Sequence, residues 1–409
     1  MNLFAKNALI FISILYLLSA SLYVLSFGIT LRFSSSFLIS IPFAFVLTRL
    51  WIGWRRGPSL KNSLVQIGKS DLQIMIGLYF FAFFLLALKM YFFASPATYD
   101  EIVHMGITRT FLTFDFSSII GELKIIPNPP LPYVVMAAVF SHFELTLQSA
   151  RIASSIISSA VPVVLYYWMK VLHDDRVLAI QVSATYIFTP LYQNLAYLYT
   201  FDGLSTLLFT LLSFYFVRGI QTKKGLYFIL SGILFAACGL TKYPPALWFL
   251  LSSMAVVALS FRRKSLRLRN LLFLPIGLTP LLLIFLVAGP HFAVAYEYGS
   301  YWNATMVYAV ISDLFFVLGW SPYLIFLSTV HRSILEGVDE KSVFFILVIT
   351  LAFLTPFVNP YTRRLVQVIP VFFIAVTERA LEIDRQALAP LVYANLSWWG
   401  ILSLLSYYL

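Results

Sequence analysis

The stretch SPATYDEIVHMGITR, residues 95–109, places two adjacent carboxylates, Asp100 and Glu101, directly after a long apolar run. Only 11% of the chain is charged, and ionisable groups at membrane depth are costly unless they have a partner or a function. A carboxylate at an apolar boundary can act as a general base, because partial desolvation raises its pKa. The alternative is that the pair caps the helix IVHMGITRTFL, since acids favour helix N-termini.

Further polar and aromatic residues occur where later apolar runs end. They are Asp202 in YLYTFDG, Lys242 and Tyr243 in GLTKYPP, Glu297 and Tyr298 in HFAVAYEYGSYWN, Arg363 and Arg364 in NPYTRR, and His104, Arg109 and Lys124 in the loop of the first acids. Acids that take a proton, cations that hold a phosphate and aromatic rings that stack on an apolar face would together form an active site. These residues therefore form the predicted site.

Several of these residues also have a purely structural interpretation. These alternatives are capping for Asp202, snorkelling for Lys242, lipid headgroup binding for Arg363 and Arg364, a bond to Asp100 for His104, and an interfacial aromatic belt for Tyr298. Residue types alone leave both interpretations open.

Composition indicates the fold class. Sixty per cent of the 409 residues are apolar and 17% are aromatic, and many uncharged runs reach the ~20 residues that cross a bilayer. We predict an all-α polytopic membrane protein. The single cysteine, Cys238, excludes an internal disulfide framework, and the net charge of +11 is explained by basic cytoplasmic loops rather than by nucleic-acid binding.

Three basic clusters, at 49–69, 218–224 and 262–269, set the predicted topology, because cytoplasmic loops are rich in Lys and Arg. About thirteen spans are expected, at 8–29, 34–53, 72–94, 149–168, 177–197, 201–217, 226–240, 244–260, 271–289, 307–330, 342–358, 364–380 and 388–408. The first is expected to be retained rather than cleaved as a signal peptide. The loop 95–148 then lies outside, and its apolar piece 131–140 is too short to cross, which predicts an interfacial helix.

Several motifs, in order, resemble the GT-C superfamily of polyprenol-dependent glycosyltransferases. TYDEIVHMGITRTFL resembles its first outer-loop segment, PNPPLPYVV its KPPLYYW segment, YLYTFDGLSTLLFTL its second acidic segment, GILFAACGLTKYPPALWFL its LALLTKGP segment, and YTRRLVQVIPVFFIAV its late RYLLPLLPAL element. The nearest likeness is to the protein O-mannosyltransferases and the aminoarabinose transferases of lipid A. The resemblance implies a catalytic core at 70–380, preceded by two extra spans and a basic loop at 1–69 and followed by a last span at 381–409.

The resemblance implies transfer of a monosaccharide from a polyprenyl or dolichyl phosphate to an acceptor hydroxyl, outside the cytoplasm and with inversion. Asp100 would be the base, Glu101 would share this role or orient the sugar, and Asp202 would be a second acid in the pocket. Lys242, Arg363 and Arg364 would stabilise the departing phosphate. Asn128 stands where relatives have a phosphate-binding lysine, and Lys124 is the candidate substitute.

Partners and membrane follow from the same interpretation. The acceptor is a protein, glycan or glycolipid, and the membrane is the plasma membrane, or the endoplasmic reticulum in a eukaryote. The simple Asp-Glu pair predicts no cofactor, with Mg²⁺ or Mn²⁺ left open as carboxylate ligands. The alternatives are a transporter or flippase, a non-catalytic scaffold, and a ligase that uses a polyprenyl diphosphate.

Overall fold

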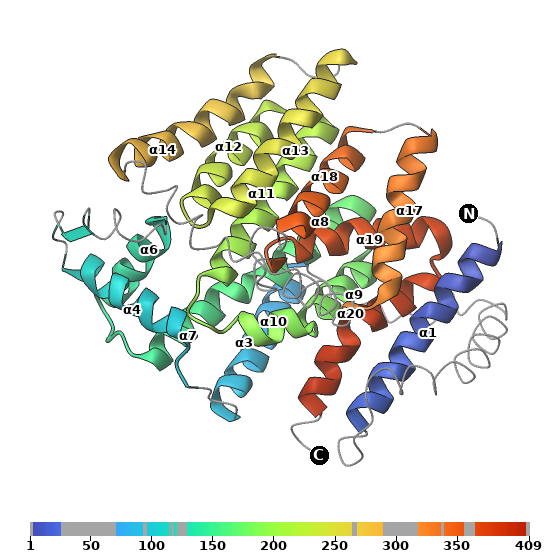
Figure 1. Ribbon diagram of the computed structural model, residues 1–409, viewed down its shortest axis with the longest axis horizontal. Helices are drawn as coiled ribbons and strands as arrows, with labels where there is room; N and C mark the ends of the chain where they lie inside the picture. Colours follow the sequence, from blue (N-terminus) through green and yellow to red (C-terminus); the bar gives the residue numbers. More distant parts are fainter. Residues whose placement is uncertain are drawn as a thin grey trace.

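The computed structural model describes residues 3–25, 71–92, 96–113, 115, 118–119, 121, 129–263, 268–288, 318–336, 339–355 and 365–405. All regular elements in these ranges are helical (Figure 1). Four helical stretches are long and apolar enough to cross a membrane: Asp71–Phe92, Leu147–His173, Asp202–Thr222 and Tyr243–Arg262. Shorter apolar helices accompany them. The chain is therefore a polytopic integral membrane protein, as predicted, whereas the predicted number of thirteen spans is not confirmed.

The helices follow one another with short connections over most of the described chain. They are α1 (Leu3–Leu25), α3 (Asp71–Phe92), α4 (Tyr99–Leu112), α6 (Leu131–Phe140), α7 (Leu147–Ser158), α8 (Ala160–His173), α9 (Arg176–Ile187), α10 (Pro190–Leu195), α11 (Asp202–Thr222), α12 (Gly225–Gly239), α13 (Tyr243–Arg262), a 3₁₀ turn (Leu268–Leu272), α14 (Phe273–Ala288), α17 (Trp320–Glu336), α18 (Glu340–Leu354), α19 (Ile369–Asp384) and α20 (Leu388–Leu405). The short helix predicted at 131–140 is α6, with the same bounds.

Two predicted spans are each divided into two helices. The stretch predicted at 149–168 is α7 followed by α8, and it begins with a capping box in which Thr146 and Ser149 satisfy each other's backbone N–H groups. The stretch predicted at 177–197 is α9 followed by α10. Proline has no N–H to continue the ladder, and the Thr189 side chain caps the new helix that begins at Pro190.

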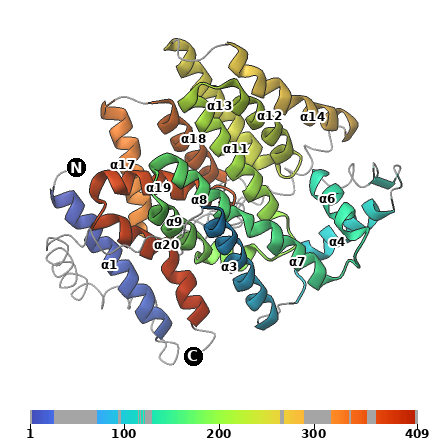
Figure 2. The same cartoon turned by 180° about the vertical axis from the view of Figure 1, so that it is seen from behind.

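The centre of the bundle is formed by α11 and α19. Helix α11 packs against α7, α8, α12, α13, α18 and α19. Every residue from Ile369 to Val376 in α19 is buried, so this helix is apolar on all sides rather than along one stripe. Helices α1, α17 and α20 lie on one flank of this centre and α12 to α14 on the other (Figures 1 and 2).

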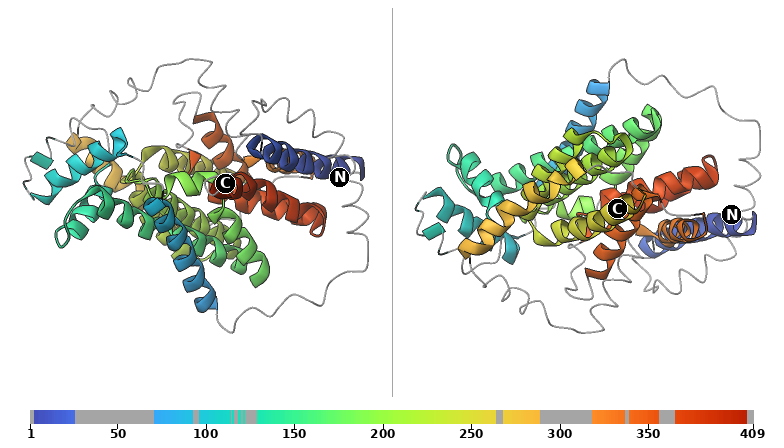
Figure 3. Two further views of the ribbon diagram at one scale, coloured as in Figure 1. Left: turned by 90° about the horizontal axis from the view of Figure 1, so that it is seen from below. Right: turned by 90° about the horizontal axis from the view of Figure 1, so that it is seen from above.

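The two short helices α4 and α6 lie together at one edge of the molecule, beside α7 (Figures 1 and 3). They have an apolar cluster of their own, which includes Met105, Phe111, Tyr133 and Phe140 and which also takes in Tyr199 and Phe201 from the segment before α11. The predicted outer loop thus folds as a separate layer against the bundle.

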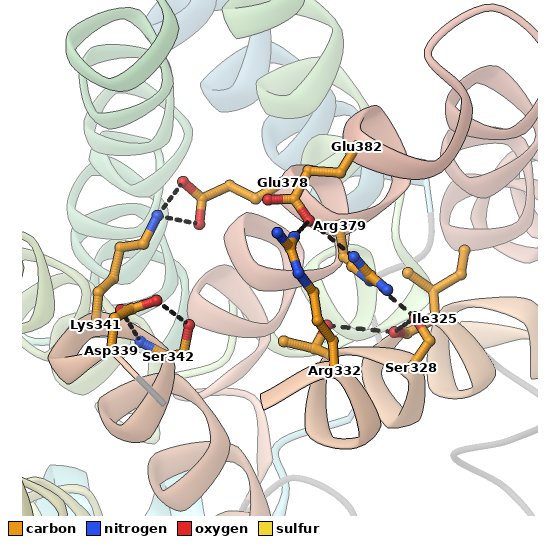
Figure 4. Close-up of polar contacts among 10 residues, drawn as sticks. Ile325, Ser328, Arg332, Asp339, Lys341, Ser342, Glu378, Arg379 and Glu382 are labelled. Carbon is orange, nitrogen blue, oxygen red and sulfur yellow. Dashed lines mark hydrogen bonds and ion pairs between the residues drawn. The ribbon is translucent and has the colours of Figure 1, made fainter. Parts of the chain in front are cut away.

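Helix directions define two ends of the bundle. We call the end where α11 begins the Asp202 end, and the end where α11 and α13 finish, at Thr222 and Arg262, the basic end. At the basic end, Lys341 bonds to Glu378 at 2.9 Å, and Arg332 and Arg379 both pair with Glu382 (Figure 4). These pairs join α17, α18 and α19 in the second half of α19, away from its start near Gln367.

Candidate functional site

The four residues from Tyr199 to Asp202 lead into helix α11. They connect the layer formed by α4 and α6 to the helix bundle. The Tyr199 backbone N–H donates to Glu101 Oε1 at 3.1 Å, and the Thr200 hydroxyl donates to Asp202 Oδ2 at 2.7 Å. The ring of Phe201 lies against His104, with centroids 4.8 Å apart. The acids predicted from two distant motifs therefore lie on either side of one short segment.

Glu101 is held by a buried, bidentate ion pair with Arg151 of α7. Arg151 Nε donates to Oε1 at 2.8 Å and Nη2 donates to Oε2 at 2.7 Å. Oε2 also accepts from the backbone N–H of Thr98 at 3.0 Å, which completes a capping box at the start of α4. With the bond from Tyr199, these contacts occupy the roughly four lone-pair positions of a carboxylate.

The hydrogen-bond donors around Glu101 favour the charged form of its carboxyl group. Burial alone would raise the pKa of its carboxyl, but the hydrogen bonds from Arg151, Thr98 and Tyr199 outweigh burial and hold that pKa below its usual value. The side chain is fully buried. Glu101 is therefore ionised at neutral pH and has no oxygen left for a substrate hydroxyl.

Asp100 differs from its neighbour in exposure. Successive helix residues point about 100° apart, so with Glu101 turned into the protein against Arg151, the Asp100 side chain leaves α4 in another direction and is half-buried. Asp100 is thus the acid of the pair that a molecule at the surface of α4 can reach.

Aromatic rings surround the first turns of α4. His104 Nδ1 lies 2.8 Å from the Tyr133 hydroxyl of α6, and the Tyr133 and Phe201 rings meet edge to face, with centroids 5.2 Å apart. The Thr108 hydroxyl lies 2.9 Å from that of Tyr199. These contacts fix α4 and α6 relative to the segment before α11.

Asp202 is the centre of a second buried polar group. Its Oδ1 accepts from the Lys242 ammonium and from Gln367 Nε2, the latter at 2.8 Å, and only 1% of the residue is exposed. Lys242 immediately precedes α13, and Gln367 precedes α19 by two residues. One carboxylate thus ties together the entrances of three helices.

The backbone around Asp202 is shaped for this role. Phe201 has a φ of 58°, in the left-handed region that non-glycine residues seldom adopt. Gly203 follows, and a Cβ there would lie 1.8 Å from the Ser158 hydroxyl of α7. The left-handed turn and the missing side chain together let α11 start close against α7 with its first carboxylate buried.

The turn that carries Lys242 is held by α6. The backbone N–H of Leu131 donates to the Leu240 carbonyl at 3.0 Å, an oxygen near the end of α12 that has no partner within its own helix. Tyr243, the first residue of α13, is half-buried beside this turn. Helix α6 therefore places the turn next to α4, against which α6 packs.

The structure brings together only some of the predicted site residues. Asp100, Glu101, His104, Asp202, Lys242 and Tyr243 belong to the connected region described above. Arg109 is exposed in the last turn of α4, about 13 Å along the helix from Asp100, and does not join them. Lys124, Asn128, Glu297, Tyr298, Arg363 and Arg364 lie outside the described residues.

Two residues of the site were not predicted from the sequence. Arg151 is a single cation in an otherwise uncharged stretch, and Gln367 is a single amide in an apolar run. Isolation of a polar residue in an apolar segment was the available signal, because such groups need a partner. Among the described residues, no three His, Cys, Asp or Glu side chains gather as a metal site would require.

Gln367→Leu is expected to weaken the Asp202 group without removing its ion pair. The lost hydrogen bond goes to a buried charge, and such bonds contribute about 1.5–3 kcal/mol. Thermal unfolding in detergent should therefore show a lower Tm for this variant. Gln221→Leu, at an exposed position in the last turn of α11, is the matched control and should leave Tm unchanged. An equal Tm for both variants would contradict the structural role of Gln367.

Comparison with known proteins bears on the same region. Residues 127–291 match the family model described as dolichyl-phosphate-mannose-protein mannosyltransferase. This range runs from α6 to α14 and contains Arg151, Asp202 and Lys242. A search of curated proteins gave no match. The family match agrees with the resemblance seen in the motifs, and it supports a membrane glycosyltransferase that depends on a lipid-phosphate sugar.

Proposed function

We propose that the protein transfers one sugar from a polyprenyl or dolichyl phosphate to an acceptor hydroxyl, with Asp100 as the general base. The observation that carries this assignment is the contrast between the two adjacent acids. Glu101 is buried with both oxygens engaged by Arg151, Thr98 and Tyr199. Asp100, one position earlier, is half-buried and can meet an acceptor.

The chemistry is a single displacement. Asp100 takes the proton of the acceptor hydroxyl as its oxygen attacks the anomeric carbon, and the bond from that carbon to the phosphate oxygen breaks. The electron pair leaves with the lipid phosphate, so negative charge grows on the phosphate. One displacement at one carbon inverts the anomeric centre.

The cations on the Asp202 side are proposed to receive the departing phosphate. Lys242 lies beside Asp202, and Arg363 and Arg364 precede the described turn that carries Gln367 by only a few residues. In this proposal Asp202 is a positioning residue, because its carboxylate is already bonded to Lys242, Gln367 and Thr200. Glu101 likewise holds α4 so that Asp100 is correctly placed.

The proposed location is the extracytoplasmic face. The spans α11 and α13 begin at the site and end at Thr222 and Arg262, next to the basic loops at 218–224 and 262–269. Basic loops favour the cytoplasm, so the opposite ends of these helices face outward. The plasma membrane, or the endoplasmic reticulum with a lumenal site, would suit this arrangement.

The test of the function is transfer by the purified protein from a panel of radiolabelled polyprenyl-phosphate and dolichyl-phosphate sugars, with mixed peptide, glycan and glycolipid acceptors. Release of the lipid phosphate coupled to a labelled acceptor is the expected result, and the active donor would name the sugar. NMR of the product should show an inverted anomeric centre. Consumption of polyprenyl diphosphate sugars alone would contradict the monophosphate donor.

A further inference from the structure

The last turn of α3 carries a cation at the membrane boundary. Lys89 lies about 27 Å along the helix from Asp71, close to the far side of a hydrocarbon layer about 30 Å thick. Tyr91 and Phe92 follow it and are 80% and 56% exposed, as is typical of aromatic side chains at a membrane interface. Lys89 therefore lies at headgroup depth at the Asp202 end.

The contacts of Lys89 set it apart from the other cations of the site region. Arg151 pairs with Glu101 and Lys242 pairs with Asp202. The Lys89 ammonium instead donates to the neutral side-chain oxygen of Asn194 in α10, and no carboxylate of the described residues pairs with it. A cation in an apolar helix needs a counter-charge, and one is available from a lipid.

The donors at this position suit a phosphate. A lysine ammonium has three N–H donors, of which Asn194 engages one, and an asparagine amide adds N–H donors of its own. Asn194 is exposed and Lys89 is only half-buried. A phosphate oxygen arriving from the membrane can therefore reach both side chains without any rearrangement of the helices.

The surface on the membrane side of Lys89 suits an acyl chain. Phe81, Leu85 and Lys89 are spaced by four residues and thus lie along one face of α3. Phe81 is 42% exposed and contacts the Phe188 ring at the end of α9, with centroids 5.9 Å apart. The bond from Lys89 to Asn194 joins this face of α3 to α10. The result is an apolar stripe that leads to a cationic head.

We propose that Lys89 and Asn194 form a binding site for the phosphate headgroup of an anionic bilayer phospholipid, with one acyl chain along Phe81 and Leu85. This site would anchor the exposed helix α3 to the membrane next to α10. It does not rest on the proposed sugar transfer.

The test uses the whole protein, purified in a neutral detergent and freed of lipid. Native mass spectrometry would measure binding of palmitoyl-oleoyl phosphatidylglycerol, and diacylglycerol with the same chains would be the probe without phosphate. Lys89→Met should weaken the tightest binding event about tenfold, as expected for one lost charge-assisted contact, whereas Lys89→Arg should restore it. Asn194→Ala, at an exposed position, should weaken it about threefold.

Lys224→Met is the matched control, because Lys224 is exposed at the basic end and its loss should leave binding unchanged. Equal phosphatidylglycerol affinity for Lys89→Met and the wild type would overturn the proposal, as would equal binding of diacylglycerol. Displacement of phosphatidylglycerol by an equal or lower concentration of polyprenyl phosphate would assign the site to the lipid substrate instead. Lys89→Met and Asn194→Ala should both elute and unfold as the wild type does. If Lys89→Met does not fold, the phosphatidylglycerol affinity of Asn194→Ala decides the test.

Discussion

Asp100→Asn should lower the rate of sugar transfer by about 10²–10⁴-fold, the usual contribution of a general base. Asparagine keeps the size and the polarity of the side chain but cannot take the acceptor proton. Because Asp100 is half-buried and lies outside the ion pair of Glu101 with Arg151, the substitution should not disturb the start of α4. Initial rates of labelled sugar transfer from the active donor, at saturating donor and acceptor, are the measurement.

The matched control is Asp115→Asn, the same chemical change at an exposed acid after the end of α4. It should leave the rate within about twofold of the wild type, since surface substitutions away from a site have small effects. Donor binding by Asp100→Asn should also be retained, so that the loss is in kcat rather than in donor affinity. A rate within a few-fold of the wild type for Asp100→Asn would remove the base assignment.

The sequence was most informative about where polar groups meet the membrane. Apolar runs of membrane length predict helices, and the residues that interrupt them are found at helix starts: Asp202 begins α11, and Lys242 directly precedes α13. The short helix predicted at 131–140 is α6, with the same bounds. These features are local, so the sequence alone contains them.

The partners of these groups could not be predicted in the same way. Arg151 is 50 residues from Glu101, and Gln367 is 165 residues from Asp202. Such pairs depend on which helices become neighbours, and no local pattern specifies that. The different surroundings of Asp100 and Glu101 follow from the same cause, because only the fold brings Arg151 to one acid of the pair.

One local sequence pattern supports a structural role for Glu101, which is to cap the start of α4. The residues Thr98-Tyr99-Asp100-Glu101 have the capping-box spacing, in which the fourth residue bonds back to the first. The predictions treated capping as an alternative to catalysis for both acids together. In the structure Glu101 caps α4, and Asp100, one position earlier in the same turn, is half-buried.

Removing either partner of the buried pair between Glu101 and Arg151 should destabilise the protein strongly. Each single variant, Glu101→Gln or Arg151→Met, leaves a charge buried without its counter-charge, which costs about 3–5 kcal/mol. In detergent, this should appear as a Tm lower by about 5 °C for a protein of this size. The matched control is Glu382→Gln at the basic end, where the half-exposed carboxylate pairs with Arg332 and Arg379 and each such pair should contribute at most about 1 kcal/mol.

The double variant Glu101→Gln/Arg151→Met distinguishes the effect of the ion pair on stability from its effect on sugar transfer. With both charges removed, no unpaired charge remains, so its Tm should lie above the value expected from adding the two single losses. Transfer should nevertheless stay low, because the bonds from Arg151 that orient the first turn of α4, and with it Asp100, are absent. Additive losses of Tm would mean that the two side chains act independently, and full activity of the double variant would show that Asp100 does not need this support.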